Sequence, residues 1–144
     1  SENLCRLYPQ LNRDLLISGV LLHDIGKITE LSGPIATEYT LQGKLLGHIS
    51  VMNAKIAQVA AELGFADTEE ETLLRHMVLS HHGKLEFGSP VLPLLMEAEV
   101  LSLIDNLDAR IIALTGALDN TEEGTFTSRM FPLENRAFYK PKTK

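Results

Sequence analysis

Apolar side chains recur at helical spacing along most of the chain, which predicts a protein built from long amphipathic helices. The first predicted helix begins after Asn12, a favourable N-cap residue, continues to about Ile25 and ends at Gly26. The second runs from about residue 41 to residue 63 and ends at Gly64, a natural C-terminal stop. Between these helices, the stretch 35–39 is expected to be extended.

Two further helices follow. The third is expected to begin at a capping box, in which the side chains of Thr68 and Glu71 each accept a hydrogen bond from the other's backbone N–H, and to end near Gly83. The fourth runs from about residue 94 to residue 118. The pattern predicts one all-α domain over residues 1–144, with an irregular tail at residues 120–144 that is rich in Gly, Thr, Pro and aromatic residues.

Composition narrows the class of protein. A chain of 144 residues that is 44% hydrophobic and 22% charged is typical of a globular domain, and no apolar run is long enough to cross a membrane. The single cysteine, Cys5, excludes an internal disulfide and favours a cytoplasmic location, and the N-terminal segment lacks a secretory signal pattern. We therefore predict a cytoplasmic protein without a membrane partner.

Charge is unevenly distributed. The net charge of −6 argues against nucleic-acid binding over the whole surface, but residues 129–144 carry five basic side chains and one acidic one. This basic tail is either a solubilising segment or an arm that contacts a polyanion.

Histidines and aspartates occupy positions where the helical pattern predicts apolar side chains. A single histidine on an apolar face is usually a hydrogen-bonded core residue, and a single inward aspartate usually pairs with a backbone amide or an arginine. Here we expect all five histidines and three aspartates to face one interior, a combination that favours a divalent metal bound by several helices. The spacing is neither that of a zinc finger nor HExxH. Apart from the fifth histidine, His76, these are the candidate site residues: His23, Asp24, His48, His81, His82, Asp105 and Asp108.

The order of these residues resembles a known family. His23-Asp-Ile-Gly-Lys27, followed by His48, His81-His82 and Asp105, is similar to the HD-domain metal-dependent phosphohydrolase superfamily. Longer stretches resemble its YhaM-type 3′–5′ exoribonuclease branch; they are residues 33–41, 43–48, 81–90, 124–127 and 133–141. The resemblance implies an HD-domain helical bundle with a short irregular C-terminal tail.

The chain departs from the superfamily pattern at its start. That pattern includes a further histidine upstream of the HD pair, whereas His23 is the first histidine here. The exoribonuclease branch also usually carries an N-terminal OB-type nucleic-acid-binding domain. Residues 2–8 look like part of a helix, and we expect the chain to be an N-terminally truncated piece of a longer protein.

The resemblance implies a role for each candidate residue. His23, Asp24 and Asp105 would hold one metal ion, and His48, His81 and His82 a second, with Asp24 bridging. Asp24 and Lys27 would be catalytic, with Lys27 on the scissile phosphate, and Asp108 would orient a ligand from the second layer. Lys44 and Lys84 would contact substrate with Lys27. Each site would hold one or two divalent ions, with Mn²⁺ preferred and Fe, Mg or Zn left open.

The implied activity is metal-dependent phosphodiester hydrolysis, in which a 3′–5′ exoribonuclease releases nucleoside monophosphates from single-stranded RNA, with DNA as a further substrate. Phe126, Phe131 and Phe138 would either stack bases or pack the tail onto the bundle. Two alternatives remain open: an HD phosphohydrolase for nucleotides or cyclic dinucleotides, and a non-catalytic metal-binding HD module. A homo-oligomer is compatible with each.

Overall fold

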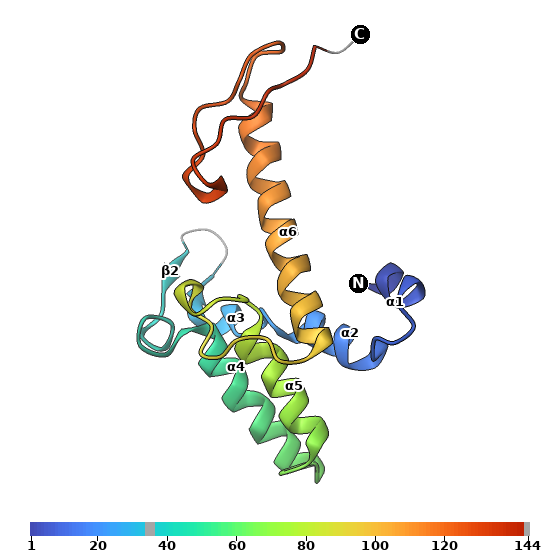
Figure 1. The fold of residues 1–144 in the computed structure, drawn as a ribbon. Coiled ribbons are helices and arrows are strands. Elements are labelled where there is room, and N and C mark those ends of the chain that lie inside the picture. Colours follow the sequence, from blue (N-terminus) through green and yellow to red (C-terminus); the bar gives the residue numbers. More distant parts are fainter. Residues whose placement is uncertain (34–36, 143–144) are drawn as a thin grey trace. The chain divides into compact units, whose positions relative to one another are not determined.

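The computed structural model describes residues 1–33 and 37–142, and within them the chain is predominantly helical, as predicted (Figure 1). Strands β1 and β2 form a two-stranded antiparallel sheet in which Leu31 pairs with Tyr39. In chain order the elements are α1 (Glu2–Leu7), α2 (Arg13–Leu22), α3 (Lys27–Glu30), β1 (Leu31–Ser32), β2 (Glu38–Tyr39), α4 (Leu41–Leu63), α5 (Glu69–Ser80), the 3₁₀ helix η1 (Leu85–Phe87), α6 (Met96–Asp119) and the 3₁₀ helix η2 (Phe131–Leu133).

Local capping fixes most helix ends where the sequence predicts them. Asn12 Oδ1 accepts the Leu15 N–H at 3.1 Å, and Gly64 ends α4 in the left-handed conformation. Thr68 caps α5 by accepting the Glu71 N–H, as predicted. The other predicted hydrogen bond of the capping box, from the Thr68 N–H to the Glu71 carboxylate, is wrong. The Glu71 carboxylate accepts instead from the N–H of Asp67, because the Thr68 N–H is directed at a carbonyl of the preceding turn.

The first predicted helix is shorter than its apolar pattern suggests. Helix α2 ends at Leu22, residues 23–26 form a turn, and α3 begins at Lys27. His23 keeps helical φ and ψ (−53° and −38°) and its N–H donates to the Gly19 carbonyl, so the chain leaves α2 only after this residue. Of the expected extended stretch, β2 is confirmed, and residues 35–36 lie outside the described part of the chain.

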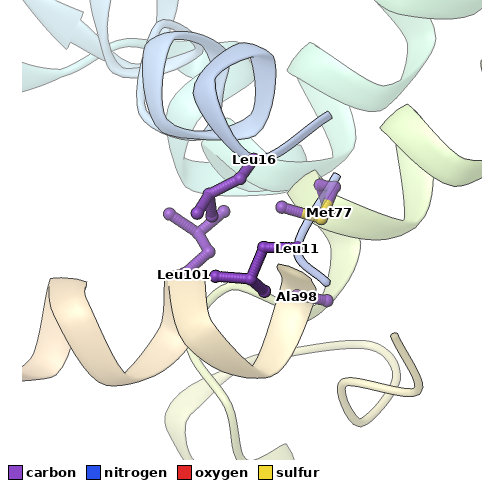
Figure 2. Packing of buried hydrophobic residues seen from close by; sticks show 5 residues of the cluster. All are labelled: Leu11, Leu16, Met77, Ala98 and Leu101. Atoms are coloured by element: carbon purple, nitrogen blue, oxygen red, sulfur yellow. The ribbon is translucent and has the colours of Figure 1, made fainter. Parts of the chain in front are cut away.

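The chain divides into two compact units, residues 1–104 and 105–144, and the boundary falls within α6. The core of the first unit joins α2, α5 and the beginning of α6 (Figure 2). Its buried residues are Leu11, Leu16, Met77, Ala98 and Leu101. A second cluster, formed by Met52, Ile56 and Val78, lies between α4 and α5.

Burial corrects the predicted apolar faces. On α4 the buried side chains include Ile49, Met52 and Ile56, whereas Leu45 is 73% exposed and Leu46 is also exposed. These two leucines precede the break in α4 at Gly47, so the helix does not present one continuous apolar face. Apolar spacing alone therefore overestimates how much of α4 is core.

The second unit consists of the remainder of α6 and a returning segment. Isolated β-bridges pair Phe126 with Tyr139 and Met130 with Arg136, and Leu133 between them in sequence is buried. Phe131 is 89% exposed, so this ring does not pack into a core. Asp108 on α6 is exposed as well, which corrects the expectation that all three aspartates face the interior.

Among the described residues, no helix combines the length and apolar character needed to span a membrane.

Candidate metal centre

Three histidines surround the carboxylate of Asp24 in the first unit. Asp24 Oδ1 lies 3.6 Å from His48 Nε2 and 3.8 Å from His81 Nε2, and Asp24 Oδ2 lies 3.6 Å from His23 Nε2. The four residues come from separate places in the chain: the end of α2 and its following turn, the middle of α4, and the end of α5. His82 joins them, with its ring centroid 4.3 Å from that of His81.

The histidine rings are oriented by hydrogen bonds on their outer nitrogens. Nδ1 of His23 donates to the Val20 carbonyl at 2.8 Å, and Nδ1 of His81 to the Val78 carbonyl at 2.7 Å. Nδ1 of His82 likewise donates to a carbonyl, that of Phe87, at 2.7 Å. Because a carbonyl oxygen can only accept, Nδ1 carries a proton, and Nε2 holds the lone pair in the neutral form of each ring. In this form Nε2 can bind a metal ion while the other ring N–H is held by a hydrogen bond.

The centre of this group contains buried atoms that cannot satisfy one another. Within the described part of the chain, Asp24 Oδ1, His48 Nε2 and His81 Nε2 are buried without a hydrogen-bond partner. A carboxylate oxygen and imidazole lone pairs are all acceptors, and each buried group without a partner costs about 1–3 kcal/mol. A divalent cation would satisfy all three, and ring nitrogens of His48, His81 and His82 lie within 4.8 Å of one another. The residues present therefore fit a divalent metal ion with mixed imidazole and carboxylate ligands.

The charge states also suit cation binding. Burial lowers the pKa of His81 to about 4, so its imidazole is neutral near neutral pH. Burial on its own raises the pKa of the Asp24 carboxyl, but the hydrogen bond from Lys27 and the nearby His23 outweigh it and hold that pKa below its usual value. Asp24 is therefore ionised while His81 remains a neutral donor of a lone pair.

Glu30, which the sequence reasoning missed, is part of this site. It is only 9% exposed, and its Oε1 accepts the backbone N–H of His48 at 3.1 Å. Its Oε2 lies 3.2 Å from His48 Nδ1. The sequence carries little signal for this residue, because Glu30 follows the polar Thr29 and precedes a single leucine, a setting that an exposed glutamate would fit equally well.

The remaining predicted residues fall into two groups. The first group is the lysines. Lys27 Nζ donates to Asp24 Oδ2 at 2.7 Å, and Lys84 Nζ lies 5.2 Å from the centroid of the Phe87 ring. Lys44 is exposed on α4. Asp105 and Asp108 lie on α6 in the second unit, Asp105 half-buried and one turn beyond Leu101. Their roles as ligand and supporting residue stay predictions.

The expectation that all five histidines gather is wrong, because His76 belongs elsewhere. His76 precedes His81 by five residues on α5, which turns it about 140° away around the helix. Its Nε2 accepts the Leu94 N–H at 2.9 Å, a structural contact with the segment before α6.

Comparison with known proteins agrees with this chemistry. The HD domain family matches residues 1–110. Proteins named 3′-5′ exoribonuclease YhaM are 55% identical in Bacillus pumilus and Bacillus subtilis and 56% identical in a Geobacillus species, each over 141 residues. These alignments cover 98% of this chain but 43–45% of the relatives, so the chain spans less than half of their length. No solved structure matches the chain significantly.

The family match covers most of the chain and contains His23, Asp24, His48, His81, His82 and Asp105. The resemblance seen in the sequence is thereby confirmed. The chain belongs to the HD domain family.

Proposed function

We propose that the chain carries the catalytic centre of a divalent-metal-dependent 3′–5′ exoribonuclease that releases nucleoside monophosphates from single-stranded RNA. The observation that carries the proposal is the convergence of three buried acceptors, Asp24 Oδ1, His48 Nε2 and His81 Nε2, on one point. The names of the relatives supply the direction of cleavage and the RNA substrate. DNA is a further candidate substrate.

His23, Asp24, His48, His81 and His82 would hold the cation or cations, and we assign Asp105 as a further ligand that α6 contributes. Mn²⁺ is the ion we propose, because it accepts both imidazole and carboxylate ligands. When bound, such a cation polarises the phosphodiester and makes water a stronger nucleophile. Asp108, which lies on the same helix as Asp105, would orient a ligand histidine without binding the cation itself.

Lysines would bind the substrate around this centre. A lysine ammonium has three donors, and Lys27 uses one of them on Asp24 Oδ2, so it can also donate to a phosphate oxygen. Lys44 and Lys84 are exposed, so their ammonium groups would be accessible to the phosphates of an RNA backbone and would attract them as point charges. Lys84 already lies over the Phe87 ring, and this pair offers a cation beside an aromatic face for a base.

Further parts of the proposal concern the protein as a whole. An OB-type domain in the unmatched length of the relatives would supply additional RNA contacts, and residues 1–144 would act as one catalytic domain. A homo-oligomer is compatible with this arrangement, and the single thiol of Cys5 fits a cytoplasmic location.

The test compares Asp24→Asn with Asp14→Asn in the chain and in a longer form extended upstream. Both substitutions remove one carboxylate, but the Asp14 side chain is 91% exposed, pairs with Arg13 and is not a candidate ligand. Single-stranded RNA labelled at the 5′ end, a nucleotide panel and cyclic dinucleotides are incubated with Mn²⁺ or with EDTA.

We expect Mn²⁺-dependent shortening of RNA from its 3′ end, lowered in Asp24→Asn by at least about 100-fold, the upper end of what losing a supporting group around a metal costs. Asp14→Asn should retain activity. Full activity in Asp24→Asn would contradict the proposal, and hydrolysis of nucleotides without RNA shortening would favour the nucleotide phosphohydrolase instead.

A further inference from the structure

We propose that Glu30 is a positioning residue that holds His48 in the tautomer able to bind a metal ion. The expected effect on Mn²⁺ affinity rests on the proposed function, whereas the effect on the His48 tautomer does not. The structural part of the proposal concerns the proton on the His48 ring and stands on contacts within the first unit.

The contacts of Glu30 are directed at both the backbone and the ring of His48. Oε1 accepts the His48 N–H at 3.1 Å and lies 3.3 Å from His48 Nδ1, while Oε2 lies 3.2 Å from the same ring nitrogen. The opposite nitrogen, Nε2, faces Asp24 Oδ1 at 3.6 Å. One carboxylate therefore determines which edge of the ring faces the centre.

Carboxylate oxygens accept hydrogen bonds, so the ring nitrogen that faces both oxygens of Glu30 carries the proton. With the proton on Nδ1, Nε2 presents a lone pair to the centre. The alternative tautomer would put the proton on Nε2, where it could donate toward Asp24 and block both groups as ligands. Glu30 selects against that tautomer, as carboxylates do in carboxylate–histidine–metal arrangements.

His48 differs in this respect from the other histidines of the group. Val20, Val78 and Phe87 supply backbone carbonyls to His23, His81 and His82, which no substitution can remove. In the described part of the chain, His48 is the member of this group whose Nδ1 is oriented by a side chain. Its tautomer can therefore be changed by a single substitution.

The fold holds Glu30 and His48 together through their backbones. A Cβ on Gly43 would lie 2.2 Å from the Glu30 carbonyl oxygen, and a Cβ on Gly26 would lie 2.2 Å from that of His48. Gly47 has a φ of 71° and a ψ of 158°, which interrupts α4 directly before His48. The interruption leaves the His48 N–H available to Glu30.

Glu30→Gln is the sharpest test, because it keeps the size of the side chain and one acceptor. With the amide oxygen on the His48 N–H, the amide NH₂ faces Nδ1 and donates to it. Nδ1 then needs its lone pair, and the proton moves to Nε2. We expect ¹⁵N NMR of the metal-free chain in mildly alkaline buffer to show Nδ1 protonated in the wild type and Nε2 protonated in Glu30→Gln.

The second readout is the affinity for Mn²⁺ alone, measured by calorimetric titration. Glu30→Gln should bind Mn²⁺ about 10–100-fold more weakly, the usual cost of removing such a partner. Glu97→Gln is the matched control, because Glu97 is also 9% exposed and also accepts a backbone N–H, from Asn12 at 2.6 Å. It should leave the His48 tautomer and the Mn²⁺ affinity unchanged, with circular dichroism confirming that both variants fold.

Retention of the Nδ1-protonated ring in Glu30→Gln would overturn the proposal, and so would a reversed tautomer with wild-type Mn²⁺ affinity. If the wild-type chain binds no Mn²⁺, the proposed function fails. In that case the tautomer in the metal-free chain decides the role of Glu30 by itself.

Discussion

Asp24 shows how far a single residue depends on its surroundings. Its two oxygens lie close to four side chains, which are the Lys27 ammonium, the neutral His81 ring, and the rings of His23 and His48. Lys27 keeps the carboxylate ionised from the solvent side, while burial keeps His81 neutral on the inner side. The site thus combines an anion and neutral lone pairs, a ligand set that suits a divalent transition-metal ion.

The lowered pKa of His81 predicts that acid destabilises the metal-free chain. The pKa is about 4 in the folded state against 6.5 for the unfolded group, so below 6.5 the unfolded state binds more protons. Stability should fall as pH decreases from about 6.5 to about 4, by up to about 3 kcal/mol from this residue. Urea unfolding in EDTA across this range measures the change.

His81→Leu removes the titrating group and should flatten that dependence. The lowered pKa of His76 acts in the same direction and the same pH range, so part of the slope will remain, whereas the lowered pKa of Asp24 acts mainly below about pH 4. An identical slope in wild type and His81→Leu would show that His81 titrates normally in the folded chain.

At the scale of elements, the site depends on a close approach between α3 and α4. The Thr40 N–H donates to the Glu30 carbonyl at 2.9 Å, and Thr40 Oγ1 donates to that of Thr29 at 2.8 Å. Thr40 also caps α4 by accepting the Gly43 N–H. One residue therefore both begins α4 and attaches it to the end of α3.

Substitution of Gly43 by alanine tests this approach. The new Cβ would meet the Glu30 carbonyl oxygen at 2.2 Å, and backbone cannot move aside as a flexible side chain can. Forcing the helices apart should lower the free energy of unfolding by about 1–3 kcal/mol or more. Urea denaturation at neutral pH measures it.

Gly116→Ala is the matched control, because a Cβ at this position on α6 meets no atom within 4 Å. Alanine is the better helix former, so this variant should be stabilised by about 0.5–1 kcal/mol. Equal effects of the two substitutions would refute close packing at Gly43.

At the scale of the whole molecule, the site exists only when the first unit is folded. Asp24 follows α2, His48 lies within α4 and His81 ends α5, and these helices meet around the two buried apolar clusters. No local segment contains the full ligand set. A cation bound here is therefore linked to folding of residues 1–104.

Mn²⁺ should consequently stabilise the chain by mass action. At a free concentration of 100 times its dissociation constant, the expected gain in unfolding free energy is about 2.7 kcal/mol. Thermal unfolding with and without Mn²⁺ measures it, and Asp24→Asn should lose most of the gain while Asp14→Asn keeps it. A similar gain in Asp24→Asn would indicate binding elsewhere on this acidic chain.

Much of the secondary structure follows from the sequence, because helix ends depend on residues within a few positions of one another. Asn12, Gly64 and the Thr68 cap act locally, and the predicted bounds of α4 are those of the structure. The HD pair and its partner histidines are likewise recognisable as a set of residue types in order.

Tertiary structure decided what depends on contacts between segments that are distant along the chain. The turn after α2 and the break at Gly47 place His23, Asp24 and His48 at one centre, and helical phase excludes His76 from it. Glu30 is recognisable as a supporting residue only through its approach to His48. Apolar spacing could not distinguish exposed Leu45 from buried Ile49, because burial depends on which neighbouring helix covers each face.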